Sequence, residues 1–214
     1  MHLPFTRAEF FDVFARYNEA VWPMQLVLVA AAVAAVGIIY TRTARGSGWV
    51  SWILAVLWAW MGLAYHLAHF AAINPVARIF GAFCLVQAGL LAWNGRLHSR
   101  LSFDPVRGPN VVVAWTLIAY ALVIYPLLGL VTGQAYMESP TFGAPCPTTI
   151  FTFGVLWFAR RPLPRSLLLV PILWSAIGGS AAFALGVPQD FGLIVAGLSG
   201  VALLLAKARS GGPG

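Results

Sequence analysis

The hydrophobic and polar positions divide the chain into a short amphipathic stretch and a series of almost wholly apolar runs. In residues 5–21, Phe10, Phe14 and Tyr17 recur at helical spacing, and charged residues occupy the positions between them. Thr6 can cap this helix, and Glu9, three residues later, completes a capping box. The pattern predicts an amphipathic helix that lies in the plane of a membrane interface without spanning the bilayer.

Seven apolar runs follow; six have a length and composition typical of a transmembrane helix, and the fifth is short. The predicted spans are 24–41, 49–72, 75–94, 110–132, 146–160, 166–186 and 189–207. We therefore predict an all-α fold, an integral membrane bundle of seven transmembrane helices preceded by the interfacial helix. The corresponding domains are 1–23 for the interfacial helix, 24–207 for the transmembrane domain and 208–214 for a disordered tail.

Composition supports a membrane protein, because 60% of the residues are hydrophobic and only 9% are charged. The net charge of +7 is explained by basic loops at the cytoplasmic face, so we expect no nucleic-acid partner and a lipid bilayer instead. Most basic residues follow odd-numbered spans: Arg42, Arg45, Arg96, Arg100, Arg107, Arg160, Arg161, Arg165, Lys207 and Arg209. The positive-inside rule then places the N-terminus outside and the C-terminus in the cytoplasm.

This topology collects the residues suited to chemistry on the outer side of the membrane. Ionisable groups inside a membrane are costly, so they are functional candidates by default. The predicted ligand or metal pocket consists of Tyr65, His66, His69, Tyr136, Glu138, Cys146, Thr148, Thr149 and Asp190.

Cys146 lies between two prolines in the connection that leads into the fifth span. Pro147 suits the first turn of a helix, which would place Cys146 at the cap position, where the helix dipole stabilises a thiolate. The preceding loop is expected to enter the membrane, which requires that protein bury it or that it line a cavity. A small buried side chain at a tight turn would explain the same residue. Cys84 lies within another apolar run, so we expect two independent thiols and no disulfide.

His66 and His69 are three residues apart and would share one helix face. Together with Cys146 they could bind a borderline-soft metal ion such as zinc or copper, but two histidines at this spacing are weak evidence for a metal, and simple hydrogen bonding at the interface also explains them. Haem is disfavoured because no two histidines lie at matching depth on separate spans. The sequence contains neither a Gly-x-Ser-x-Gly elbow nor a phosphate-binding loop.

Four segments carry a resemblance to a known family. They are LPFTRAEFFDVFARYNEAVWP, LWAWMGLAYH with INP, PTFGAPCPTTIFTFG, and LWSAIGGSAAFALGVPQDFGL. The chain resembles an uncharacterised family of small bacterial multi-pass membrane proteins, a domain of unknown function. Gln134 stands where that family often has His, which weakens any ligand set that needs this imidazole. The resemblance implies a bacterial inner-membrane location and supplies no catalytic residues.

Three functions fit these features. The first is a binding or sensing module with an outward-facing polar pocket for a small ligand or metal ion. The second is a transporter or channel for a small solute or ion that uses the same pocket as a vestibule. The third is an integral-membrane enzyme with Cys146 as nucleophile and His66 as base, which requires the two side chains to lie within hydrogen-bond reach.

Overall fold

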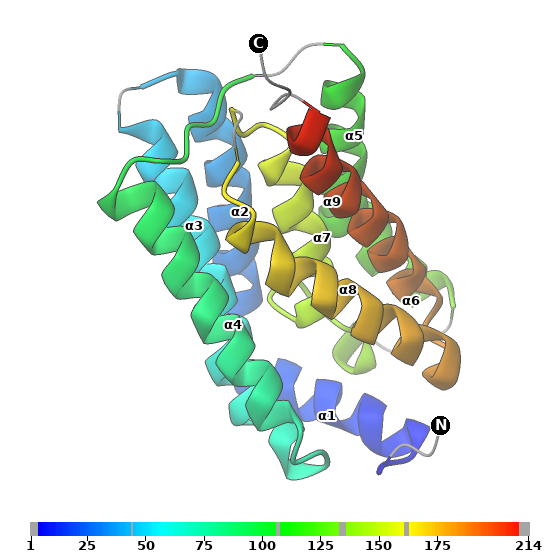
Figure 1. The fold of residues 1–214 in the computed structure, drawn as a ribbon. Coiled ribbons are helices and arrows are strands. Elements are labelled where there is room, and N and C mark those ends of the chain that lie inside the picture. Colours follow the sequence, from blue (N-terminus) through cyan, green and yellow to red (C-terminus); the bar gives the residue numbers. More distant parts are fainter. Residues whose placement is uncertain (1–3, 44, 106–107, 133–135, 161–162, 210–214) are drawn as a thin grey trace.

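The computed structural model describes residues 4–43, 45–105, 108–132, 136–160 and 163–209, and this part of the chain is predominantly helical (Figure 1). The helical elements, in chain order, are α1 (Arg7–Ala20), α2 (Met24–Thr41), α3 (Gly46–Trp60), η1 (Met61–Leu67), η2 (Phe70–Ala72), α4 (Ala77–Leu91), η3 (Ala92–Leu97), α5 (Pro109–Ala119), η4 (Tyr120–Ile124), α6 (Tyr125–Val131), η5 (Tyr136–Glu138), α7 (Pro145–Leu156), α8 (Ser166–Leu185), η6 (Pro188–Asp190) and α9 (Phe191–Arg209).

Six helical segments of the described chain are long and apolar enough to cross a membrane. They are Met24–Thr41, Gly46–Ala72, Ala77–Leu97, Pro109–Val131, Ser166–Leu185 and Pro188–Leu205, and they correspond to six of the seven predicted spans. The predicted span 146–160 is instead the 12-residue α7. At 1.5 Å per residue α7 is about 18 Å long, which is shorter than the hydrocarbon core of about 30 Å.

α7 is the central helix of the bundle. Every residue of α7 except Cys146 is buried, and its neighbours include α5, α8 and α9. α7 therefore has no side that faces lipid or water, and its three threonines, Thr148, Thr149 and Thr152, are buried against protein.

π-helical turns continue α3, α4 and α5 as η1, η3 and η4. Pro126 lies immediately after η4 and Tyr125, and a proline has no N–H to donate to the carbonyl four residues earlier. The widened turn before Pro126 accommodates this break without ending the helix. π-helical turns often occur at functional sites, and η1 carries Tyr65 and His66.

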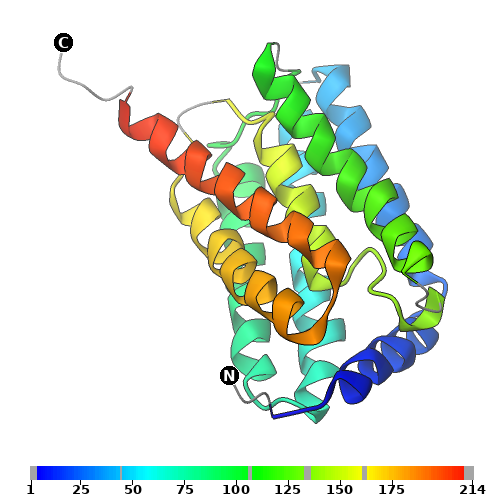
Figure 2. The same ribbon diagram turned by 90° about the vertical axis from the view of Figure 1, so that its right-hand side faces the viewer.

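α1 lies across one end of the bundle, as Figures 1 and 2 both show. The predicted capping box is confirmed, because the Glu9 N–H donates to Thr6 Oγ1 at 3.2 Å and the Thr6 N–H donates to Glu9 Oε2 at 2.7 Å. The apolar face is buried, with Phe10 and Phe14 among its residues. This face packs against the chain's own η1, η2 and α8 residues, including Tyr65, rather than standing free.

The other end of the bundle is formed by the C-terminal ends of α2, η3 and α7 (Figure 1). There the Asp104 N–H donates to the Phe158 carbonyl, and the Arg160 N–H donates to the Ser102 carbonyl. The Arg160 guanidinium also pairs with the Asp104 carboxylate. These bonds attach the connection after η3 to the end of α7.

One close helix contact depends on a glycine. A Cβ at Gly95 in η3 would lie 1.9 Å from Ser51 Oγ of α3, which is closer than any real contact. Gly89, two turns earlier on α4, has no atom within 4 Å of its Cβ position. Gly95 therefore lets η3 approach α3, whereas Gly89 has no comparable packing role.

Candidate ligand-binding cavity

Asn18 connects α1 to the loop that leads into α7. Its side chain is fully buried and donates from Nδ2 to the carbonyls of Met137 at 2.7 Å and Ser139 at 2.9 Å. Its Oδ1 accepts a hydrogen bond from the Thr141 hydroxyl at 2.7 Å. One amide thus satisfies three groups of an irregular segment, and this segment has few partners of its own.

Tyr17, the neighbouring residue on α1, lies next to the loop, since its hydroxyl oxygen is 3.2 Å from the position of a Cβ on Gly143. Its hydroxyl accepts a hydrogen bond from Trp60 Nε1 at 2.8 Å, and its ring packs edge-on against Tyr65. Burial raises the pKa of Tyr17 to about 12, although the Trp60 hydrogen bond lowers it, so this hydroxyl stays protonated at neutral pH.

The loop turns into α7 at Gly143, whose φ of +100° favours glycine. A Cβ there would lie 2.4 Å from Leu28 Cδ1, so a larger residue would also collide with α2. The Gly143 N–H donates to Thr148 Oγ1 at 3.2 Å. The loop is buried in protein from Ser139 to Ala144, which is the condition that irregular backbone would have to meet inside a membrane.

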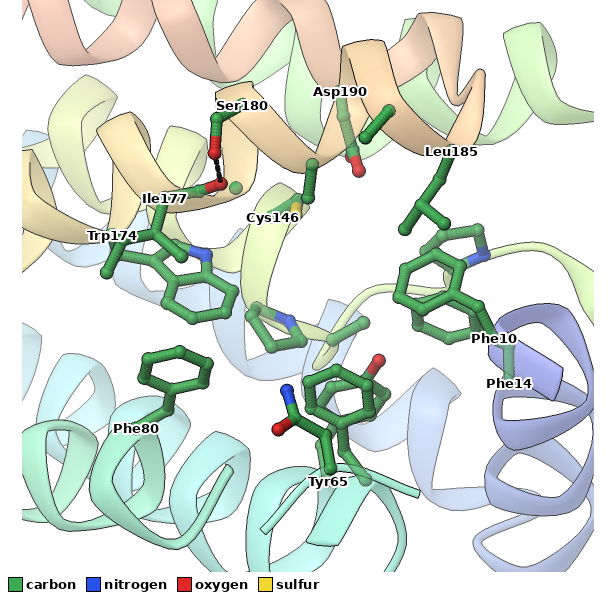
Figure 3. Close-up of a pocket in the computed structure, with 18 of the residues that line it drawn as sticks. Phe10, Phe14, Tyr65, Phe80, Cys146, Trp174, Ile177, Ser180, Leu185 and Asp190 are labelled. Atoms are coloured by element: carbon green, nitrogen blue, oxygen red, sulfur yellow. Dashed lines mark hydrogen bonds between the residues drawn. The ribbon is translucent and has the colours of Figure 1, made fainter. Parts of the chain in front are cut away.

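The N-cap of α7 lies two residues earlier than the sequence predicts. Ala144 is the N-cap, and Pro145 and Pro147 both lie in the first turn, where a missing N–H breaks no helical hydrogen bond. Cys146 is therefore inside the first turn and not at the cap position. Its thiol is directed to the space between α7, α8 and the start of α9 (Figure 3).

A cavity of about 170 Å³ lies at this point, between α1, the η1–η2 segment, α4, α8 and the first turn of α7. Its walls are mainly aromatic and small apolar side chains. The lining includes Phe5, Phe10, Phe14, Tyr65, Phe70, Phe80, Trp174, Ile177, Ala181, Ala184 and Leu185. Figure 3 shows Phe80 and Trp174 on one side, and Phe10 and Phe14 on the other.

Two polar side chains of the cavity, Cys146 and Asp190, lie where α7 meets the start of α9, and Asn74 lines another part of the wall. Asp190 is 4% exposed, and its Oδ1 accepts a hydrogen bond from the buried Tyr125 hydroxyl. Its side chain projects into the cavity beside Cys146 (Figure 3). A Cβ placed on Gly178 would lie 3.6 Å from Cys146 Sγ and 3.5 Å from Trp174 Nε1, so the thiol and the indole N–H meet at the same point of α8.

His66 lies behind the cavity wall. Its ring packs against Trp174 with centroids 5.0 Å apart and against Phe80 at 5.8 Å. Both of its ring nitrogens are buried and make no hydrogen bond. In particular, His66 does not hydrogen-bond Cys146, as the predicted nucleophile–base pair would require.

The side chains of His66 and His69 do not meet at one site. His69 Nδ1 lies 2.7 Å from the Ala64 carbonyl, and its ring packs against Tyr17, because the helix changes from η1 to a turn between the two residues. Among the described residues, no group of three or more His, Cys, Asp and Glu side chains is arranged to hold a metal ion. The predicted metal set of His66, His69 and Cys146 is therefore not assembled.

The other predicted pocket residues are distributed over several places. Tyr65, Cys146 and Asp190 line the cavity. Thr148 binds the loop backbone, and Thr149 is buried with its hydroxyl unpaired. Glu138 is exposed in a separate outer depression beside α1, and the side chain of Tyr136 lies outside the described residues.

Sequence reasoning missed most of the cavity wall and its strongest polar pair. Nothing in the sequence pattern distinguishes Phe80 and Trp174 from the other residues of their apolar helices. Tyr125 precedes a proline, and the sequence does not indicate a partner for its hydroxyl. Asn18 carried a signal that could have been used, since it is a polar residue next to Tyr17 on the apolar side of α1. An amide on a buried helix face must find partners, and only the neighbouring loops could provide them.

The part of the chain that the structure describes is a helical protein with six helices of membrane-spanning length and a buried carboxyl group in an aromatic cavity. Residues 7–212 match DUF6064, a family of unknown function, and the chain belongs to this family. This agrees with the sequence resemblance to an uncharacterised domain. Neither the curated proteins nor the solved structures contain a match to the chain.

Proposed function

We propose that this chain is a multi-pass membrane protein that binds a small, mainly apolar ligand in the cavity beneath α1. The observation that carries the proposal is the cavity itself, which has aromatic walls and a few polar side chains, among them Asn74, Cys146 and Asp190. Small-molecule sites typically combine an apolar wall with a few convergent polar groups that orient the ligand. The site is more apolar than the polar pocket that the sequence predicts.

The volume indicates the size of the ligand. An engineered apolar cavity of about 150 Å³ binds benzene, so a cavity of about 170 Å³ suits a compound with one ring and a small substituent. The mouth lies beside Ala184 and Ser180, which are exposed on α8. A ligand would enter there, from the side of the bundle near the α1 end.

We further propose that α7 and its flanking loops form a fifth, short crossing, which gives seven crossings with the N-terminus outside. The alternation of helix ends in Figure 1 supports this count, since α7 runs between the α1 end and the opposite end. Among the described residues, several basic side chains lie at that opposite end, including Arg42, Arg96 and Arg160, and the positive-inside rule assigns such an end to the cytoplasm. The cavity would then face the outer side of a bacterial inner membrane.

Fluorine NMR with 4-fluorotoluene tests the binding proposal on the full chain in zwitterionic nanodiscs. We expect a saturable bound signal that disappears in Ala184→Trp, because the indole fills the mouth of the cavity. Ala176→Trp is the matched control, since Ala176 is also exposed on α8 but does not line the cavity. Equal signals from the two variants would show partition into lipid alone and would overturn the proposal.

A further inference from the structure

The buried carboxyl group of Asp190 points to the chemical class of the ligand. We propose that the cavity recognises a hydrophobic organic ammonium ion, with the ammonium group bound by Asp190 and the hydrocarbon part among the aromatic rings. This inference rests on the proposed function, and it specifies which compounds the cavity selects.

Asp190 has no basic partner among the described residues. The salt bridges of that part of the chain join Arg16 to Asp12 and Arg160 to Asp104, both at the surface. The described residues that line the cavity include no lysine, arginine or histidine. A carboxylate taken out of water is costly unless an opposite charge or several hydrogen bonds compensate it.

Arg7 is a basic side chain at the same end of the bundle, and it is directed elsewhere. Its guanidinium donates to the Gly186 carbonyl at 3.4 Å and lies over the Phe11 ring at 5.4 Å. Phe11 does not line the cavity, and neither does Arg7. Arg7 therefore leaves the Asp190 carboxylate without a counter-charge.

The protein compensates only in part for the cost of burying the Asp190 carboxylate. The Tyr125 hydroxyl donates a hydrogen bond to Asp190, the Cys146 thiol interacts with the same carboxylate, and the N-terminus of α9 follows directly in the chain. A neutral donor and the partial charge of a helix end stabilise a carboxylate less than a full positive charge does. A ligand that brings this charge would complete the site.

The aromatic walls favour the same class of ligand. Trp174 and Phe80 meet edge to face with centroids 5.4 Å apart, and Tyr65 lies across the cavity from them. Aromatic faces attract cations, and tryptophan does so most strongly. A bare metal ion fits less well, because it needs several oxygen, nitrogen or sulfur ligands and the described residues gather no such group.

Three compounds of nearly equal shape separate the contributions: 4-fluorobenzylamine, 4-fluorobenzyl alcohol and 4-fluorotoluene. We expect the amine, which is protonated at pH 7, to bind at least about ten-fold more tightly than the toluene, with the alcohol in between. Signal that persists in Ala184→Trp is subtracted as lipid partition. This comparison uses the wild-type chain and is decisive even if a variant at Asp190 does not fold.

Asp190→Asn then tests the role of the charge. We expect the amine to lose its advantage while 4-fluorotoluene binds as before, and we expect Asp12→Asn, at an exposed carboxylate of α1, to change neither. If the toluene binds and the amine gains nothing, or if the amine keeps its advantage in Asp190→Asn, the ammonium inference is wrong and the binding proposal stands. If none of the three compounds binds the wild-type cavity, both are wrong.

Discussion

Asn18 offers the sharpest test of how the cavity is built. Asn18→Ala removes two donors and one acceptor that α1 provides to the loop before α7. A buried hydrogen bond contributes roughly 1 kcal/mol net, so the loss of three corresponds to about 3 kcal/mol. The unfolding temperature of a chain of this size changes by about 2–4 °C per kcal/mol, which predicts a decrease of about 6–12 °C.

The assay is thermal unfolding of the full chain in nanodiscs, followed by hydrogen exchange of the loop amides. Glu19→Ala is the matched control, because Glu19 is exposed on the same helix and its side chain should contribute less than about 0.5 kcal/mol. We expect faster exchange at Ala144, whose N–H bonds the Thr141 carbonyl, in Asn18→Ala only. An unfolding temperature within about 2 °C of the control would refute the role assigned to Asn18.

Three further predictions concern packing, pH and thiol access. Gly95→Ala should destabilise the protein by about 1–3 kcal/mol in the same thermal assay, because the new Cβ would collide with Ser51. Gly89→Ala is the control and should be neutral or stabilising, since its Cβ position is open. Equal effects of the two substitutions would contradict the close contact between η3 and α3. The hydrogen bonds of the capping box lower the pKa of Glu9. Wild type should therefore be more stable than Glu9→Gln above the ordinary glutamate pKa of about 4.3, and this difference should disappear as the pH falls through the lowered pKa. A stability difference that does not change with pH would contradict this role of the Glu9 carboxylate. A small neutral thiol reagent, methyl methanethiosulfonate, should modify Cys146 at the cavity and leave the buried Cys84 intact, as measured by mass spectrometry of peptides, and faster modification of Cys84 would contradict the cavity geometry.

Much of the fold follows from apolar patterning. The predicted span 24–41 coincides with α2, and the predicted cap of α1 is the observed one, because both depend on residues near in sequence. The π-helical turns could not be predicted, since they depend on packing between helices and on Pro126 rather than on a local pattern. The short length of α7 was also hidden, because a buried central helix and a transmembrane helix have the same apolar composition.

The site was predictable only in part, for a related reason. Cys146 and Asp190 stood out because polar residues are rare in this sequence, and both line the cavity. The spacing of His66 and His69 suggested a shared face, but the change of helix type after η1 separates their surroundings. The aromatic wall brings together residues of the α1 region, the η1–η2 segment, α4 and α8, and a single sequence gives no information on such contacts.

The most direct measurement of the central claim is the position of a bound amine. An experimental structure of the full chain with 4-bromobenzylamine would locate the bromine by its anomalous scattering. We predict a bromine peak among Phe80, Trp174 and Phe14, with the ammonium group next to the Asp190 carboxylate. Bromine peaks at saturating amine that lie only on the outer surface of the bundle would contradict the claim that this cavity is the binding site.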